Sequence, residues 1–125
     1  MVETIAAMAR LRRTREIRHR VYAQAREDFL NHCQTRFRVV HPPESVVMAT
    51  LGLIHLYHMR SPGGSDLLHI ATAEHIQSML PGGSISLMCC DLRLRSVAEE
   101  RGFDVFDPLR DPLSALVPPT ASSDS

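Results

Sequence analysis

The stretch SISLMCCDLRLRSVAEERGFDVFDP, residues 84–108, decides the fold class. It begins with a short apolar run that ends in Asp91, which is typical of a strand buried on both faces of a parallel sheet. A helix is predicted over 92–101, with Gly102 just after its end. The alternating residues 103–108 predict a second strand, which a proline ends. Strand, helix and strand in succession predict a parallel sheet with a crossover helix.

Upstream of this stretch, the sequence predicts one further short strand and several helices. The run FRVVHPP (37–43) is rich in β-branched residues and is stopped by two prolines, so we expect a strand there. Apolar periodicity and glycine-rich breaks predict the helices. They are expected over 2–13, 16–34, 44–60 and 65–80. The whole pattern is that of an α/β fold.

The length of 125 residues suits one domain. We expect that domain over 1–112, followed by a tail over 113–125 that is rich in proline and serine and partly disordered. Within the tail, Leu113, Leu116 and Val117 are expected to dock on the domain.

The composition argues against a membrane or secreted protein. Hydrophobic residues make up 44% and charged residues 22%, as in soluble globular proteins. No apolar run approaches the roughly 20 residues that span a bilayer, and the N-terminus has no signal-peptide pattern. Three cysteines, two of them adjacent, do not suit a disulfide framework. These features predict a cytoplasmic protein in a reducing compartment.

Basic residues concentrate near the N-terminus. All 14 are arginine, although the net charge of the chain is zero. A local basic patch can bind a phosphate backbone even on a neutral chain. A solvated helix face and a bias in codon usage are the alternative explanations, and the sequence leaves them open. The clustered residues are Arg10, Arg12, Arg13, Arg15, Arg18 and Arg20.

Two carboxylates from distant parts of the chain are expected at one edge of the sheet. Asp91 follows the buried strand, and Asp66 begins a helix in the stretch GSDLLHIATAEH (64–75). Ligands of open α/β sheets bind outside the carboxyl ends of the strands. Two acids that repel one another there would favour a bound Mg²⁺ or Mn²⁺. Each acid also has a structural explanation, Asp66 in a first helical turn and Asp91 as a helix N-cap.

The sequence resembles the PIN-domain family, which are small metal-dependent nucleases that include VapC-like toxins. SDLLHIATAEH resembles that family's Asp-x-x-His-x-Ala-x-Ala helix. LMCCDLRLRSVAEERGFDVFDP is similar to its strand ending in Asp, its short helix and its following strand. VETIAAMARLRR resembles its helix that carries a glutamate. The resemblance covers nearly the whole chain and implies a three-layer α/β fold, a parallel sheet flanked by helices.

The resemblance also implies a function. It predicts a metal-dependent endoribonuclease, the toxin of a toxin–antitoxin pair, with Asp66, Asp91 and Glu3 as catalytic metal ligands for Mg²⁺ or Mn²⁺. RNA is then the substrate, with Arg10 and Arg13 on its backbone. An antitoxin protein or a second copy of the chain is the expected partner.

The sequence also departs from the family's pattern. The strand that carries the family's first acid has no counterpart before Glu3, so the sheet is expected to be incomplete at its N-terminal side. Cys89 stands where the family often has Ser or Thr. A chain without that strand would be unstable alone, poorly soluble, or dimeric by strand exchange. One explanation is that the chain is a truncated nuclease of this type. The alternative function is a catalytically inactive relic that acts as a protein-interaction module. An unrelated phosphate-binding domain is a third reading, which lacks support because no glycine-rich loop carries a lysine.

Overall fold

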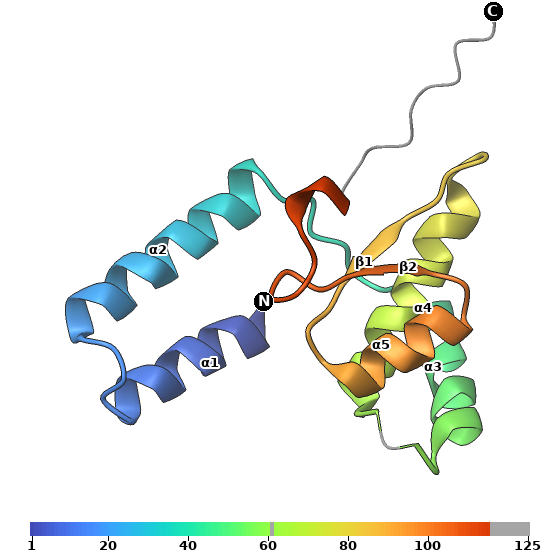
Figure 1. Ribbon diagram of the computed structural model, residues 1–125, viewed down its shortest axis with the longest axis horizontal. Helices are drawn as coiled ribbons and strands as arrows, with labels where there is room; N and C mark the ends of the chain where they lie inside the picture. Colours follow the sequence, from blue (N-terminus) through green and yellow to red (C-terminus); the bar gives the residue numbers. More distant parts are fainter. Residues whose placement is uncertain (61, 116–125) are drawn as a thin grey trace, which may run out of the picture. The chain divides into compact units, whose positions relative to one another are not determined.

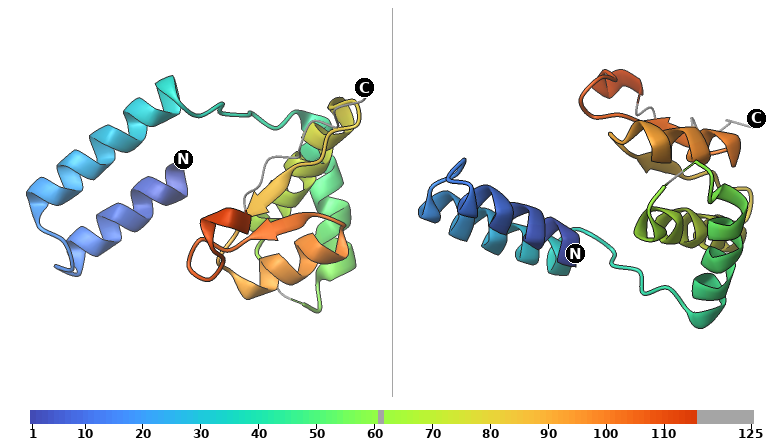
Figure 2. Two further views of the ribbon diagram at one scale, coloured as in Figure 1. Left: turned by 45° about the horizontal axis from the view of Figure 1, so that its top comes forward. Right: turned by 90° about the horizontal axis from the view of Figure 1, so that it is seen from below.

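The computed structural model describes residues 1–60 and 62–115, and the chain forms two compact units, Met1–His41 and Pro42–Ser125. The prediction of a single domain over 1–112 therefore stays a prediction. Figure 1 and the two further views in Figure 2 show a helical hairpin in the first unit and a mixed helix–strand arrangement in the second.

The first unit is a pair of helices, α1 (Val2–Arg13) and α2 (His19–Thr35). The helix predicted over 16–34 begins three residues later because Arg15 has a φ of 63°, a left-handed backbone that ends the first helix and turns the chain. No described side chain of α2 is fully buried. Two helices can cover only one face of each other, so much of the hairpin's apolar surface stays accessible.

The strand predicted over 37–43 is wrong. These residues follow α2 without regular secondary structure. Among the described residues, no backbone N–H from 38 to 41 donates to a backbone carbonyl. A β-rich sequence becomes a strand only when a second strand accepts its backbone hydrogen bonds, and this segment has no such partner.

The described part of the second unit contains three α-helices, two short strands and one 3₁₀ helix, η1 (Leu113–Ala115). The helices are α3 (Glu44–Tyr57), α4 (Gly64–Met79) and α5 (Leu92–Glu100). Strand β1 (Ser86–Met88) pairs in parallel with β2 (Asp104–Phe106). Both strands lie inside the predicted runs but are shorter. The fold is thus α/β and mostly helical with a two-stranded parallel sheet, and a three-layer PIN-like architecture remains a prediction.

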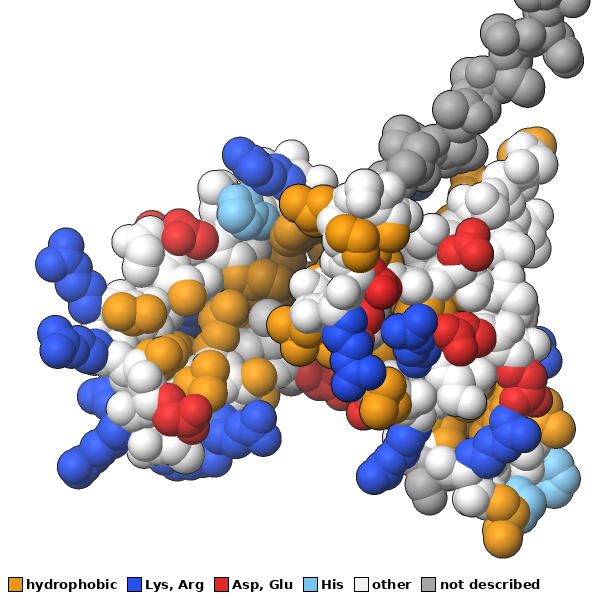
Figure 3. Space-filling model, in the orientation of Figure 1, with side chains coloured by type: hydrophobic (Ala, Val, Ile, Leu, Met, Phe, Trp, Pro, Cys, Tyr) orange, Lys and Arg blue, Asp and Glu red, His pale blue; other side chains and the backbone are white. Residues whose placement is uncertain are grey.

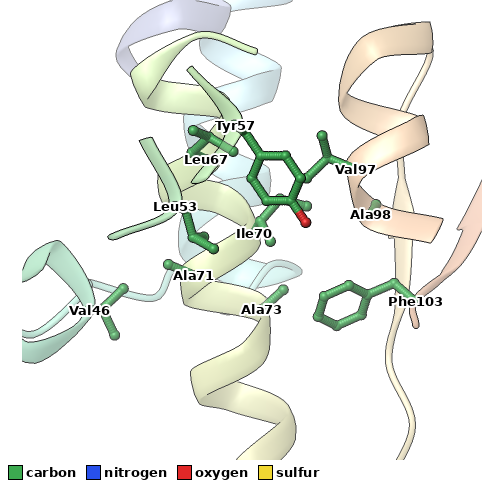
Figure 4. Close-up of a cluster of buried hydrophobic side chains, with 10 residues drawn as sticks. All are labelled: Val46, Leu53, Tyr57, Leu67, Ile70, Ala71, Ala73, Val97, Ala98 and Phe103. Carbon is green, nitrogen blue, oxygen red and sulfur yellow. The ribbon is translucent and has the colours of Figure 1, made fainter. Parts of the chain in front are cut away.

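The core of the second unit forms where α3, α4 and α5 meet (Figure 4). Leu67 and Ile70 of α4 are each 1% exposed, and Val97 of α5 is equally buried. Tyr57, near the end of α3, points into the same cluster as Leu67 and Val97. Helix α4 is therefore the element on which the other helices pack.

The end of α5 agrees with its prediction. Gly102 has a φ of 85°, the left-handed conformation that commonly follows a helix and leads directly into β2. In contrast, the predicted docking of Leu113 is wrong, because its side chain is 80% exposed. Leu116 and Val117 lie outside the described residues.

Candidate metal site at the carboxyl edge of the sheet

The parallel pairing brings two aspartates to the same edge of the sheet. Met88 is the register partner of Phe106, and the Cys89 N–H donates to the Phe106 carbonyl at 2.9 Å. The two strands therefore end at the same level. Asp91 follows β1 and Asp107 follows β2, so both residues lie just beyond the carboxyl ends of their strands.

Asp91 is the N-cap of α5. Its Oδ1 accepts hydrogen bonds from the backbone N–H groups of Arg93 at 2.8 Å and Leu94 at 3.1 Å. The bonds from Leu94 and Arg93 hold the pKa of the Asp91 carboxyl below its usual value. Its Oδ2 has no hydrogen-bond partner among the described residues. The side chain is exposed, so that oxygen is available to a ligand.

Asp66 lies in the first turn of α4 and bonds back to the N-cap residue, Gly63. Its Oδ2 accepts a hydrogen bond from the Gly63 N–H at 3.0 Å, and the carboxylate satisfies a backbone donor that the helix leaves free. The side chain is half-buried, and no hydrogen bond to Oδ1 occurs within residues 1–60 and 62–115. Like Asp91, Asp66 thus uses one oxygen for the fold and keeps one free.

The thiol of Cys89 shows that these carboxylates share one neighbourhood. Burial raises its pKa most, and the negative charges of Asp91, Asp66 and Asp107 raise it further. The Sγ also donates to the Asp91 backbone carbonyl at 3.3 Å, which has the opposite effect. Three carboxylates from three different segments therefore lie close enough to act on one buried sulfur.

Asp107 was not among the residues predicted from the sequence. It is 2% exposed, and its Oδ1 accepts from the Leu109 N–H at 2.9 Å. The Nε of Arg110 lies 3.6 Å from its Oδ2. The available signal was the repeated pattern of an apolar strand followed by an acid, since VFD at 105–107 repeats what MCCD at 88–91 shows.

The donor set suits a hard divalent cation in part. Mg²⁺ takes one or two carboxylates and keeps several waters, so the free oxygens of Asp66 and Asp91 have the right chemistry. In the part of the chain that the structure describes, no group of three His, Cys, Asp or Glu side chains is arranged to hold a metal ion. Arg93 and Arg110 also supply positive charge close to Asp91 and Asp107.

The third predicted ligand, Glu3, lies on α1 in the first unit. It lines a shallow surface depression of about 400 Å³ together with Arg10 and Arg13, the two predicted RNA contacts. All three side chains are exposed. Figure 3 shows basic side chains projecting from the hairpin around a strip of apolar ones. The helix thus presents an acid and two arginines on one face.

Comparison with known proteins identifies no relative: no family model, curated protein or solved structure matches the chain. None of the described helices has both the length and the apolar character needed to cross a bilayer.

Proposed function

We propose that the chain is a metal-dependent endoribonuclease of PIN type, with Asp66 and Asp91 as ligands of one Mg²⁺ or Mn²⁺. The observation that carries the proposal is the parallel pairing that puts Asp91 and Asp107 just beyond the carboxyl ends of both strands. Among the described residues, Asp91 and Asp66 each keep one carboxylate oxygen outside any hydrogen bond. Acids that approach one another at the carboxyl edge of a parallel sheet repel unless a cation compensates them.

The reaction would be the hydrolysis of a phosphodiester. The chemistry that Mg²⁺ or Mn²⁺ would supply when bound is polarisation of a phosphoryl oxygen and a lower pKa for the attacking water. Asp66 and Asp91 would each give one free oxygen to the cation while their other oxygen stays bonded to the backbone. Arg10 and Arg13 would bind the phosphates of the RNA, and Glu3 is the third proposed ligand.

A second candidate is a protein-interaction module with no catalytic activity. Two observations favour it. The described residues contain no group of three potential ligands, and arginines already offset part of the negative charge. On this reading Asp66 and Asp91 serve only as helix caps. An antitoxin-like protein or a second copy of the chain would then be the partner.

Thermal unfolding with increasing Mn²⁺ distinguishes the two candidates. A ligand that binds only the folded state stabilises it by about 2.7 kcal/mol at a hundredfold excess over Kd. We expect a rise in melting temperature with Mn²⁺ for the wild type. The rise should disappear in Asp66→Asn and in Asp91→Asn, because each variant removes one charged ligand.

Asp104→Asn is the matched control. Asp104 is an exposed acid at the amino end of β2, at the opposite end of the paired strands from Asp91 and Asp107. This variant should keep the full response to Mn²⁺. Cleavage of a fluorescent single-stranded RNA should be measured on the same four proteins. The wild type and Asp104→Asn should cleave it, and Asp66→Asn and Asp91→Asn should not. A wild type that neither responds to Mn²⁺ nor cleaves RNA would exclude the nuclease and leave the interaction module.

A further inference from the structure

One edge of the sheet is open. Strand β1 pairs with β2 on one side, and among the described residues no strand pairs with its other side. The Cys89 N–H points to β2. Because alternate residues of a strand direct their backbone groups to opposite sides, Ser86 and Met88 direct theirs to the open edge.

An apolar groove runs along this open edge. Its volume is about 440 Å³, and five consecutive residues of the β1 segment, 85–89, line it. The opposite wall comes mainly from α4, through His69, Thr72 and Ile76 among others. No residue of β2 lines the groove, so the groove lies on the side of β1 away from β2. Helix α4 therefore extends over space that no strand of the described chain fills.

The side chains that line this groove favour an apolar, extended occupant. No Asp, Glu or Arg side chain lines it, so it suits an extended segment with apolar side chains. Pairing β1 directly with β1 of another copy would bring a second α4 over the same edge. Helices pack about 8–10 Å apart while strands pair at about 4.8 Å, so the two α4 helices would collide. The occupant must be an extended segment without a covering helix.

The chain contains a segment with these properties at 37–40, FRVV. Phe37, Val39 and Val40 are 56%, 38% and 39% exposed, and the Phe37 ring lies edge-on to His32 with 5.9 Å between the ring centroids. The N–H groups of residues 38–40 donate to no backbone carbonyl in the described chain. In an extended segment Phe37 and Val39 share one face, with Arg38 and Val40 on the other. That arrangement would place two apolar side chains under α4 and leave the arginine in water.

We propose that two copies of the chain form a dimer by strand exchange, in which the Phe37–Val40 segment of each copy adds to the open edge of β1 in the other. The exchange pairs the free backbone groups of both partners and covers the apolar groove. Both copies give and receive the same segment, so the contact closes on itself as a two-fold dimer. This proposal does not depend on a bound metal.

Sedimentation velocity over a range of concentrations tests the proposal on the full chain. We expect the wild type to dimerise reversibly. Val39→Pro removes a backbone N–H from the segment but suits its extended backbone, and it should weaken dimerisation at least tenfold. Val39→Thr keeps the N–H and the β-branched shape, so this matched variant should still dimerise. Thr72→Arg places a charge in the groove and should also weaken the dimer at least tenfold.

Mixing the two defective variants gives a sharper result. The Val39→Pro chain keeps its groove and the Thr72→Arg chain keeps its segment, so the mixture can form one intact pairing and should contain a heterodimer. Circular dichroism should show that each variant remains folded, and its response to Mn²⁺ should not change.

Three outcomes would overturn the exchange. The first is a wild type that stays monomeric at all concentrations. The second is a monomer that Val39→Pro destabilises, which would indicate that the segment acts within one chain. The third is a dimer that Val39→Pro leaves intact but Leu51→Arg abolishes. Leu51 is 54% exposed on α3, so this result would assign the interface to that helix.

Discussion

At the scale of single residues, Asp91 shows how one carboxylate can serve both the fold and a site. Its Oδ1 caps α5 through two backbone N–H groups, and its Oδ2 accepts no hydrogen bond from the residues that the structure describes. The same geometry explains why sequence reasoning alone could not choose between a cap and a ligand. Both roles need an acid directly before a helix, and they differ only in what the second oxygen contacts.

Replacing Asp91 separates the two roles. Asp91→Ala removes the acceptor for the Arg93 and Leu94 N–H groups and should lower the free energy of unfolding. Asp91→Asn keeps an acceptor, because asparagine caps helices about as well as aspartate, and should stay close to the wild type. Urea unfolding without metal measures both. Equal stability of the alanine variant and the wild type would contradict the capping role.

The charge of Asp91 also predicts a dependence on pH. The pKa of Asp91 is lower in the folded chain than in the unfolded chain, where aspartate has a pKa of about 3.9. The unfolded state therefore binds more protons between these two values, and stability rises with pH there. The stabilisation that Asp91 provides is fully present above the pKa of the unfolded state. It is lost as the pH falls through the pKa of the folded state. Urea unfolding from acid to neutral pH should show a shallower slope for Asp91→Asn.

At the scale of elements, α4 is the main support of the second unit. Ile70→Ala deletes a side chain that is 1% exposed and should lower the free energy of unfolding by roughly 2–5 kcal/mol. Leu56→Ala is the control, because Leu56 on α3 is 60% exposed and should cost less than about 0.5 kcal/mol. Chemical denaturation of both variants measures the difference. Similar losses for the two would show that α4 does not form the core.

Two glycines should respond to alanine in opposite directions. Gly52 lies inside α3, where a Cβ would meet nothing within 4 Å, so Gly52→Ala should stabilise the chain by about 0.5–1 kcal/mol. Gly102 has a φ of +85°, so Gly102→Ala forces an L-residue into a left-handed conformation and should cost about 1–2 kcal/mol. Thermal unfolding of both variants shows whether each substitution stabilises or destabilises the chain. A stabilised Gly102→Ala chain would contradict the helix end described for α5.

The helices were predicted well because their signals are local. Apolar periodicity and glycine-rich breaks placed all five α-helices within three residues at each end. The left-handed Arg15, which delays α2, has no signal in its side chain. The strand at 37–43 failed for a different reason. A strand depends on a partner that the local sequence does not contain. Residues 37–40 have the composition of a strand, but no strand pairs with them in the described part of the chain.

The candidate site was predictable in part. A strand followed by an acid, and an acid at a helix start, led to Asp91 and Asp66, and both charges act on Cys89. The role of these acids as ligands of one cation stays a prediction. Asp107 was not predicted because the sequence pattern at this position was interpreted only as the end of a strand before a proline. Its burial and its contact with Arg110 depend on the fold of residues 107–111, which the sequence pattern does not specify.

At the scale of the whole molecule, the basic residues divide between two environments. Arg60 and Arg101 in the second unit form ion pairs with Glu100 and Glu74. Arg10 and Arg13 on α1 are exposed, and no ion pair involves them within the described chain. Under the proposed function, exposed arginines without an acidic partner in the described chain bind the phosphates, so the first unit should make the larger contribution to the proposed RNA binding.

The salt dependence of RNA binding tests this division. Each phosphate contact to a single strand contributes roughly 0.7 to the slope of log affinity against log salt concentration. The double variant Arg10→Gln, Arg13→Gln should therefore weaken binding and flatten that slope by roughly 1.4. The control Arg60→Gln, Arg101→Gln removes as many charges, but from arginines that already have acidic partners, and should change the slope less. Fluorescence anisotropy of a labelled single-stranded RNA measures both slopes, and a larger change in the control would place the RNA on the second unit instead.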